Sequence, residues 1–235
     1  IQNIKAIAKT AHENGIIFHT DAVQALGAVK IDVDDMDIDL MSMSAHKIYG
    51  PKGCGALFIR NGIKCDDLLD GGAQERKRRA GTTNVPAVAG FGKAVEIATR
   101  DIIVNQQKIK TIRDYFVKQI TEKIPYIRVN GHPYQKVQGI VNIGFEMVDA
   151  EALLTMLDLE GIAVSIGSAC TSGVAEKSHV LQAMRVPEEY LKGSIRFSFG
   201  KNISKEDIDY TIEKLCEIVA KLRSISSATK TGRAK

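Results

Sequence analysis

Helical and strand-like spacings of apolar residues alternate along the first part of the chain. Apolar side chains recur at helical spacing over residues 2–14, at Ile4, Ile7, Ala8 and Ala11. This spacing predicts an amphipathic helix. Short apolar runs then predict strands near residues 16–20, 38–43 and 54–60. The first two runs are almost wholly apolar, which is typical of parallel strands buried on both faces of a sheet.

A second group of helices and strands follows a polar, glycine-rich and basic stretch from 61 to 84, which predicts a long surface loop. Pro86 opens a helical stretch that a second amphipathic helix continues to about residue 123. The pattern then predicts strands near 126–130, 138–145, 162–166 and 194–199, and a helix over 149–159. A last helix begins at Ser204, where S-K-E-D resembles a capping box, and ends near Arg223.

These elements predict an α/β protein of two parts. The composition does not change sharply, so we place the boundary within the long helical stretch, near residues 90 to 105. The resulting expectation is a first domain over 1–100, a second over 101–224 and a disordered tail over 225–235.

Composition and charge exclude several classes of protein. The chain has 235 residues and a formal net charge of +4 at pH 7. No apolar run approaches the ~18 residues of a membrane-spanning helix, and the first residues predict an amphipathic helix and not a signal peptide. Basic residues cluster only in short stretches such as 76–79, a smaller excess than a nucleic-acid-binding face shows. We expect a cytoplasmic protein that binds neither membranes nor nucleic acid directly.

The cysteines suggest neither a disulfide framework nor a zinc site, because none forms a C-x-x-C pair. They stand at Cys54, Cys65, Cys170 and Cys216. Cys170 differs from the others, because glycine, serine and threonine surround it in G-S-A-C-T-S-G. These small polar neighbours predict an exposed, mobile loop, where a nucleophilic thiol would be reachable.

Lys47 and Asp21 are the main candidates for chemistry. Lys47 follows an apolar run in S-M-S-A-H-K-I-Y-G-P-K. A lysine at the inner end of a core strand usually has a functional role, because its charged amine is seldom buried otherwise. Such a lysine can lose its proton and form a Schiff base with a carbonyl compound. A second apolar run leads to Asp21. An acid and a lysine at two strand ends are what a protein needs to hold pyridoxal 5'-phosphate (PLP), with the carboxylate on the pyridine nitrogen.

Other polar residues supply the remaining groups that PLP chemistry requires. Gln24 can bond to the phenolic oxygen of the ring. Ser44 and His46 flank the lysine and can donate to the phosphate, as can the hydroxyl of Thr82 or Thr83. Farther along the chain, an arginine within S-I-R-F-S-F-G, Arg196, can bind a substrate carboxylate with its planar guanidinium group.

Each of these residues has an ordinary structural explanation when it is taken alone. An acid after a strand is more often a helix cap, and a lysine there is usually solvated. A lone His46 would be a structural histidine, and Arg196 would pair with a neighbouring acid. The joint pattern, H-T-D-A-V-Q followed by S-A-H-K-x-x-G-P-K-G, favours the cofactor site.

With these motifs the chain resembles a cysteine desulfurase of the class V aminotransferase family. The resemblance runs from residue 1 to about 223, and its motifs are H-T-D-A-V-Q-A-L-G, S-A-H-K-I-Y-G-P-K-G-C-G-A-L, G-G-A-Q-E-R-K-R-R-A-G-T-T-N-V-P, G-S-A-C-T-S-G and S-I-R-F-S-F-G. It implies part of a type I PLP-transferase large domain, with a mostly parallel sheet and helices on both faces. A smaller C-terminal α/β domain would follow.

The resemblance also implies the role of each residue in the cofactor site. Lys47 would be the Schiff-base lysine, Asp21 would face the pyridine nitrogen, and Gln24 would face the phenolic oxygen. Ser44 and His46 would bind the phosphate.

Further implied roles concern the substrate, the sulfur and the second subunit. Thr82 matches the threonine that reaches the phosphate of the other subunit, which implies a homodimer. Arg196 matches the arginine that binds the substrate carboxylate, and Cys170 matches the cysteine that carries a persulfide.

The implied reaction converts L-cysteine to L-alanine and passes the persulfide sulfur to an acceptor protein, such as an iron–sulfur scaffold. Iron–sulfur cluster assembly, tRNA thiolation and cofactor biosynthesis are the uses that this resemblance implies. Selenocysteine lyase and class V aminotransferase remain as alternative activities, since both would use Lys47, Asp21 and Arg196. A non-catalytic truncated relative that binds other proteins remains as well.

The sequence departs from the family pattern mainly at its start. The upstream half of the cofactor domain, with its phosphate loop and the side chain stacked on the ring, has no counterpart here. Three explanations remain: the sequence is a fragment of a longer enzyme, a second chain supplies the missing half, or this polypeptide is inactive alone. We expect a fragment. Ala73 stands where many relatives have glycine, and Ile166 where serine is common.

Overall fold

The computed structural model describes residues 1–166 and 178–232, with side chains described up to residue 226. It divides into two compact units, Ile1–Val104 and Asn105–Lys235, and each is considered by itself. Among the described residues, no helix is both long enough and apolar enough to cross a membrane.

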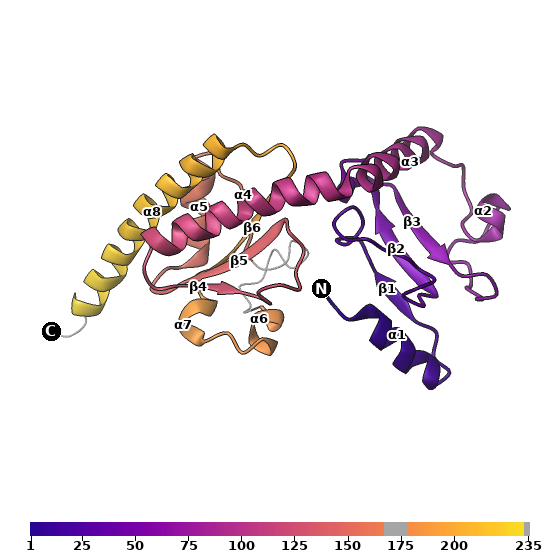
Figure 1. The fold of residues 1–235 in the computed structure, drawn as a ribbon, viewed down its shortest axis with the longest axis horizontal. Coiled ribbons are helices and arrows are strands. Elements are labelled where there is room, and N and C mark those ends of the chain that lie inside the picture. The colour runs from indigo at the N-terminus through magenta and orange to yellow at the C-terminus, as the bar shows by residue number, and fades with distance from the viewer. Residues whose placement is uncertain (167–177, 233–235) are drawn as a thin grey trace. The chain divides into compact units, whose positions relative to one another are not determined.

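The first unit contains a three-stranded sheet (Figure 1). Its strands, in spatial order, are β1 (His19–Asp21), β2 (Leu40–Ser44) and β3 (Gly55–Ile59). β1 pairs with β2 in parallel, and β3 pairs with β2 antiparallel. A 3-10 helix, η1, follows β2, and the helices of the unit are α1 (Ile4–Glu13), α2 (Gln74–Lys77) and α3 (Val85–Arg100). The helix predicted over residues 2–14 is thus present.

Local chemistry explains where these helices begin. The Asn3 side chain accepts a hydrogen bond from the Ala6 amide at the start of α1, and Asn84 does the same for Ala87 at the start of α3. The structure therefore begins α3 at Val85, directly before the proline from which the sequence predicts a helix.

The sheet of the first unit differs from the prediction in two respects. Ile16 and Ile17 lie outside β1 and are 59% and 53% exposed, so the strand predicted from residue 16 begins only at His19. β1 and β2 are parallel as predicted, but neither is buried on both faces in this unit. The physical reason is that β1 is an edge strand of a small sheet, which leaves much of its surface in solvent.

A charge network joins α1 to the residues around β2. Asp39 is buried and accepts hydrogen bonds from the Phe18 amide at 2.9 Å and from His12 Nε2 at 2.7 Å. The other ring nitrogen of His12 lies 2.8 Å from Asp37, and Arg60 Nε lies 3.7 Å from Asp39. His12 is therefore a structural link between α1 and these two acids.

The second unit is built on an antiparallel sheet with β5 at its centre. Its strands are β4 (Ile127–Asn130), β5 (Ile140–Phe145) and β6 (Ser194–Ser198). The helices are α4 (Ile102–Lys123), which begins within the first unit, α5 (Ala150–Leu159), α6 (His179–Ala183), α7 (Glu188–Leu191) and α8 (Lys205–Gly232). Side chains on one face of the sheet pack against side chains of α4, α5 and α8 and form a single apolar core.

Alternation along the strands separates the two faces of this sheet. Ile143 and Phe145 are fully buried in the core, and Gly144 between them faces the other side. A β-carbon at Gly144 would lie 2.7 Å from the backbone oxygen of Tyr190 on α7, so only glycine fits there without a shift. α7 therefore packs closely against the second face.

Three predictions for the second unit need correction. Residues 162–166 form no strand, and only an isolated antiparallel bridge joins Ser165 to Arg196. α8 continues to Gly232, so its predicted end near Arg223 was wrong, and the expected tail is helical as far as that glycine. The guanidinium of Arg223 donates to two backbone oxygens at 3.0 Å, an anchor within the helix and not at its end. α6 and α7 were not predicted.

The capping box at the start of α8 is confirmed. The Ser204 amide donates to Asp207 Oδ2 at 2.9 Å, and the Asp207 amide donates to Ser204 Oγ at 3.1 Å. This reciprocal pair satisfies two backbone donors at the helix start.

Candidate active site

The parallel pairing of β1 and β2 brings Asp21 and Lys47 to the same edge of the sheet. Asp21 is the last residue of β1 and lies opposite Ser42 of β2. β2 ends two residues later at Ser44, and η1 (Ala45–Ile48) follows directly with Lys47 on it. Both residues therefore lie at the carboxyl ends of adjacent parallel strands, the edge at which open α/β sheets bind ligands.

The turn that carries Lys47 is fixed by backbone hydrogen bonds. The Ala45 amide donates to the Cys54 carbonyl at 3.0 Å, and the Gly50 amide donates to the Ala45 carbonyl at 2.9 Å. Ala45 and Ile48 are buried, since residues three apart share one side of a 3-10 helix.

Lys47 lies on the exposed side of this turn. The expectation of a lysine at the inner end of a buried strand was therefore wrong for this unit, because the strand ends before Lys47 and the 3-10 turn presents its side chain to solvent. The amine has no ion-pair or hydrogen-bond partner in the part of the chain that the structure describes.

The other residues predicted at this edge keep hydrogen-bonding capacity for a ligand. Asp21 Oδ1 accepts from the Val23 amide at 2.9 Å, while Oδ2 has no partner among the described residues. Gln24 is exposed, and its side chain likewise has no partner there. A hydrogen bond of 2.7 Å joins Ser44 Oγ to His46 Nδ1, so the second ring nitrogen of His46 remains available.

His19 and Ser42 support this edge without belonging to the predicted site. His19 Nε2 and Ser42 Oγ are 2.8 Å apart, which links β1 to β2 directly before their carboxyl ends.

Thr82 and Thr83 lie in the exposed connection between α2 and α3. The assignment of Thr82 to a phosphate of a second subunit stays a prediction.

This donor set fits PLP. Within the described part of the chain, it contains an amine without a partner, a carboxylate with one open oxygen, and a hydroxyl–imidazole pair, all at or directly after the carboxyl ends of two adjacent strands. Asp21, Gln24, Ser44, His46 and Lys47 are the residues that would hold the cofactor. PLP needs a lysine, an acid for its ring nitrogen and donors for its phosphate, and each type is present.

Arg196 lies in the second unit, on β6. Its Nη2 donates to Ser165 Oγ at 3.2 Å, and the two residues also form the isolated backbone bridge. Its Nε is buried and has no hydrogen-bond partner among the described residues. Cys170 lies outside the described residues.

Two asparagines beside Arg196 were not predicted from the sequence. Asn130 on β4 lies opposite Asn142 on β5, and Asn142 lies opposite Arg196 on β6. Asn130 is buried, and its Nδ2 donates to Asn142 Oδ1 at 2.7 Å. The available signal was an asparagine within each of two short strand-like segments, I-R-V-N and I-V-N-I.

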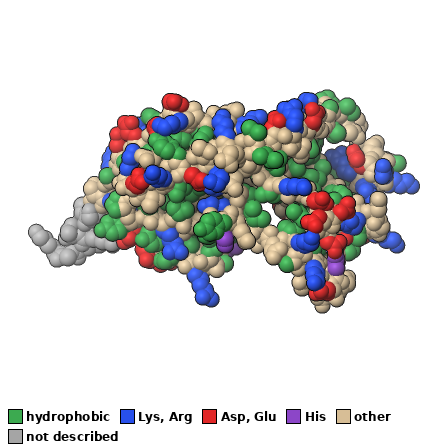
Figure 2. All heavy atoms as spheres, viewed as in Figure 1, with side chains coloured by type: hydrophobic (Ala, Val, Ile, Leu, Met, Phe, Trp, Pro, Cys, Tyr) green, Lys and Arg blue, Asp and Glu red, His purple; other side chains and the backbone are tan. Residues whose placement is uncertain are grey.

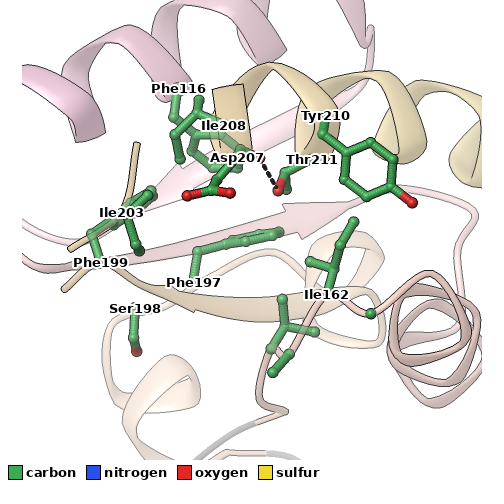
Figure 3. Close-up of a pocket in the computed structure, with 13 residues that line it drawn as sticks. Phe116, Ile162, Phe197, Ser198, Phe199, Ile203, Asp207, Ile208, Tyr210 and Thr211 are labelled. Carbon is green, nitrogen blue, oxygen red and sulfur yellow. Dashed lines mark hydrogen bonds between the residues drawn. The ribbon is translucent and has the colours of Figure 1, made fainter. Parts of the chain in front are cut away.

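A pocket of the second unit, shown in Figure 3, lies on the other face of β6. It has a volume of about 260 Å³, and apolar side chains such as Phe116, Ile162, Phe197 and Ile208 line it. Because Phe197 alternates with Arg196 along the strand, this pocket is separate from the arginine. Its polar groups are largely engaged, as in the 2.7 Å bond from Thr211 to the Asp207 carbonyl.

Comparisons with known proteins define the class. The family model "Aminotransferase class-V" matches residues 1–211, and the chain belongs to this family. A NifS-like protein from Rickettsia africae has a similar solved structure, with a TM-score of 0.84, 34% identity, and coverage of 93% of this chain and 57% of that one. A second NifS-like structure has a TM-score of 0.85 at 29% identity, with coverage of 94% and 57%. The fold is accordingly part of a type I PLP-transferase fold.

Curated relatives are closer in sequence. The chain is 52% identical over 229 residues to cysteine desulfurase IscS of Methanosarcina thermophila, which covers 97% of this chain and 56% of that protein. It is 46% identical over 226 residues to cysteine desulfurase IscS of Dictyoglomus turgidum, with coverage of 96% and 57%. The chain thus spans a little over half the length of these relatives.

Proposed function

We propose that this chain serves a PLP-dependent cysteine desulfurase, which converts L-cysteine to L-alanine and holds the released sulfur as a persulfide on Cys170. The observation that carries the proposal is the Lys47 amine, which has no partner among the described residues and lies at the same sheet edge as Asp21, in a chain 52% identical to a cysteine desulfurase. Selenocysteine lysis and amino-group exchange are the rival activities.

Each residue of the site has a defined task in this proposal. PLP, when bound, withdraws electrons from the α-carbon of the amino acid. The Lys47 amine binds the cofactor and then accepts and returns the α-proton. The Asp21 carboxylate faces the ring nitrogen and keeps it protonated. Gln24, Ser44 and His46 hold the polar edge of the ring and the phosphate, and Arg196 binds the substrate carboxylate.

The sulfur step balances without an external oxidant. The Cys170 thiolate attacks the sulfur of L-cysteine and forms a sulfur–sulfur bond. The carbon–sulfur bond breaks, its electron pair stays on the carbon, and a proton completes the methyl group of L-alanine. The β-carbon is reduced by two electrons, and the Cys170 sulfur and the transferred sulfur are each oxidised by one.

The proposal extends to the surroundings of the enzyme. Two copies form a homodimer in which Thr82 of one subunit contacts the phosphate held by the other. The persulfide sulfur passes to a thiol of an acceptor protein, such as a scaffold for iron–sulfur clusters, in the cytoplasm. Support for this role comes from relatives named cysteine desulfurase IscS.

The decisive experiment is the location of bound PLP. PLP is added to the chain, the bond to lysine is fixed with borohydride, and mass spectrometry locates the label. We expect the label on Lys47, none in Lys47→Ala, and full labelling in Lys64→Ala, because Lys64 is an exposed lysine away from the strand ends. Labelling of another lysine, or equal labelling of Lys47→Ala, would refute the proposal.

Product analysis separates the rival activities. The PLP-loaded chain should release L-alanine from L-cysteine with persulfide on the protein. Release from L-selenocysteine alone, or exchange of amino groups with a keto acid, would assign the same site to one of the rivals.

A further inference from the structure

A row of polar side chains crosses the sheet of the second unit. Asn130, Asn142 and Arg196 lie opposite one another on β4, β5 and β6, and the bridge adds Ser165 beside Arg196. Directly opposed residues on antiparallel strands share a face, with β-carbons about 4.5–5.5 Å apart. The row is therefore continuous and lies on the face opposite the apolar core.

Two atoms of this row are buried without a partner among the described residues. They are the amide oxygen Oδ1 of Asn130 and the Nε of Arg196, one an acceptor and the other a donor. Unpaired buried polar atoms are uncommon because each forfeits its hydrogen bond to water. Asn142 stands between the two residues and accepts from Asn130 Nδ2.

One rearrangement offers both atoms a hydrogen-bond partner from Asn142. A half-turn about the Cβ–Cγ bond exchanges the oxygen and nitrogen of an asparagine amide, which have nearly the same size and opposite hydrogen-bonding roles. After a half-turn of both amides, Asn142 Nδ2 donates to Asn130 Oδ1. The Asn142 oxygen then takes the place of its amide nitrogen, on the side of the group away from the bond to Asn130, and Arg196 lies opposite Asn142 on the other neighbouring strand, β6.

We propose that Asn142 and Asn130 are positioning residues for Arg196, joined as Arg196 Nε–H to Asn142 Oδ1 and Asn142 Nδ2–H to Asn130 Oδ1. This inference rests on the proposed function in taking Arg196 as the residue that binds the substrate carboxylate. With Nε held by Asn142 and Nη2 by Ser165, the guanidinium plane is fixed. Nη1 and the second proton of Nη2 remain for the two carboxylate oxygens.

The first test measures the hydrogen bond itself, by exchange of the Arg196 Nε proton with water in nitrogen-15 NMR spectra of the chain. We expect slow exchange of this proton in the parent. In Asn142→Leu the acceptor is lost, and the exchange rate should be at least about tenfold higher than in the parent. Asn142→Asp keeps an acceptor and should retain slow exchange with a displaced resonance. Asn202→Leu, on an exposed turn of the same unit, is the matched control.

The second test measures substrate binding in the PLP-loaded chain. Asn142→Leu should raise the KM for L-cysteine about tenfold with kcat changed less than twofold, since Asn142 acts through Arg196 and touches no reacting atom. Arg196→Lys should raise the KM at least as much. Equal Nε exchange rates in the parent and Asn142→Leu would overturn the positioning role.

The two proposals fail in different ways. If Arg196→Lys leaves the KM for L-cysteine unchanged, the proposed role of Arg196 in substrate binding fails, and the exchange rates still decide the role of Asn142. If Arg196→Lys raises the KM while Asn142→Leu changes neither the KM nor the exchange rate, only the positioning role fails.

Discussion

At the scale of single residues, the site depends on side chains whose hydrogen bonds are incomplete. Lys47 and Oδ2 of Asp21 have no partner among the described residues, and the same holds for Nε of Arg196. By contrast, His12 and Asp39 use their polar atoms within the fold. Polar groups that form hydrogen bonds within the fold stabilise the chain, whereas polar groups without a partner among the described residues can bind a ligand.

His12 gives a pH-dependent stability. Its pKa is raised above the ordinary histidine value because the ring hydrogen bonds to Asp39 and then to Asp37. A raised pKa in the folded state stabilises the protein fully below the unfolded pKa of about 6.5, and the contribution is lost as the pH rises through the folded pKa. Asp39, with a lowered pKa, loses its contribution only in acid.

We therefore expect the urea concentration at the midpoint of unfolding of the first unit to decrease in the parent as the pH rises from 6 to 8. His12→Gln, which keeps hydrogen-bonding groups without the titration, should show a smaller change over this range. The same pH dependence in both proteins would assign the effect to another group.

At the scale of elements, sequence patterns succeeded where several residues act together. The helix over 2–14 and the box at Ser204 were predicted because periodicity and capping chemistry are local. The predicted strand at 162–166 was wrong because only Ser165 pairs with β6, and strand pairing depends on a distant partner. α6 and α7 are too short for a helical period to appear.

The capping box predicts a measurable contribution of Ser204. Ser204→Ala removes the acceptor for the Asp207 amide and should lower the unfolding free energy of the second unit by about 1 kcal/mol. Ser204→Asp keeps an acceptor at the cap and should restore most of this loss. Urea unfolding followed by circular dichroism measures both, and equal midpoints for parent and Ser204→Ala would contradict the assignment.

At the scale of the whole molecule, the proposed chemistry is divided between two units. Lys47 belongs to the first unit, whereas Arg196 and Cys170 belong to the second. The candidate residues could be named from motifs, because each motif is short and contiguous, and their roles stay predictions. The exposure of Lys47 and the row beside Arg196 could not, since both depend on how strands and turns pack. The surface in Figure 2 mixes acidic and basic side chains, in keeping with a mild net charge.

This division predicts separable losses. Cys170→Ala should bind PLP at Lys47 as the parent does but should lose sulfur release from L-cysteine, because the thiol acts only after the cofactor is in place. The two measurements are borohydride labelling and sulfide production with a thiol reductant. Full desulfuration by Cys170→Ala would exclude Cys170 as the nucleophile.

The alternation along β6 has a further consequence. Arg196 faces the polar row and Phe197 faces the apolar core, so a slip of one residue against β5 would bury a guanidinium among aromatic rings and expose a phenyl group. A folded form in which β6 is shifted by one residue and Arg196 lies on the core face is therefore excluded. The burial of apolar side chains that fixes the register of this sheet therefore also fixes the face on which Arg196 lies, at the position that we propose binds the substrate carboxylate.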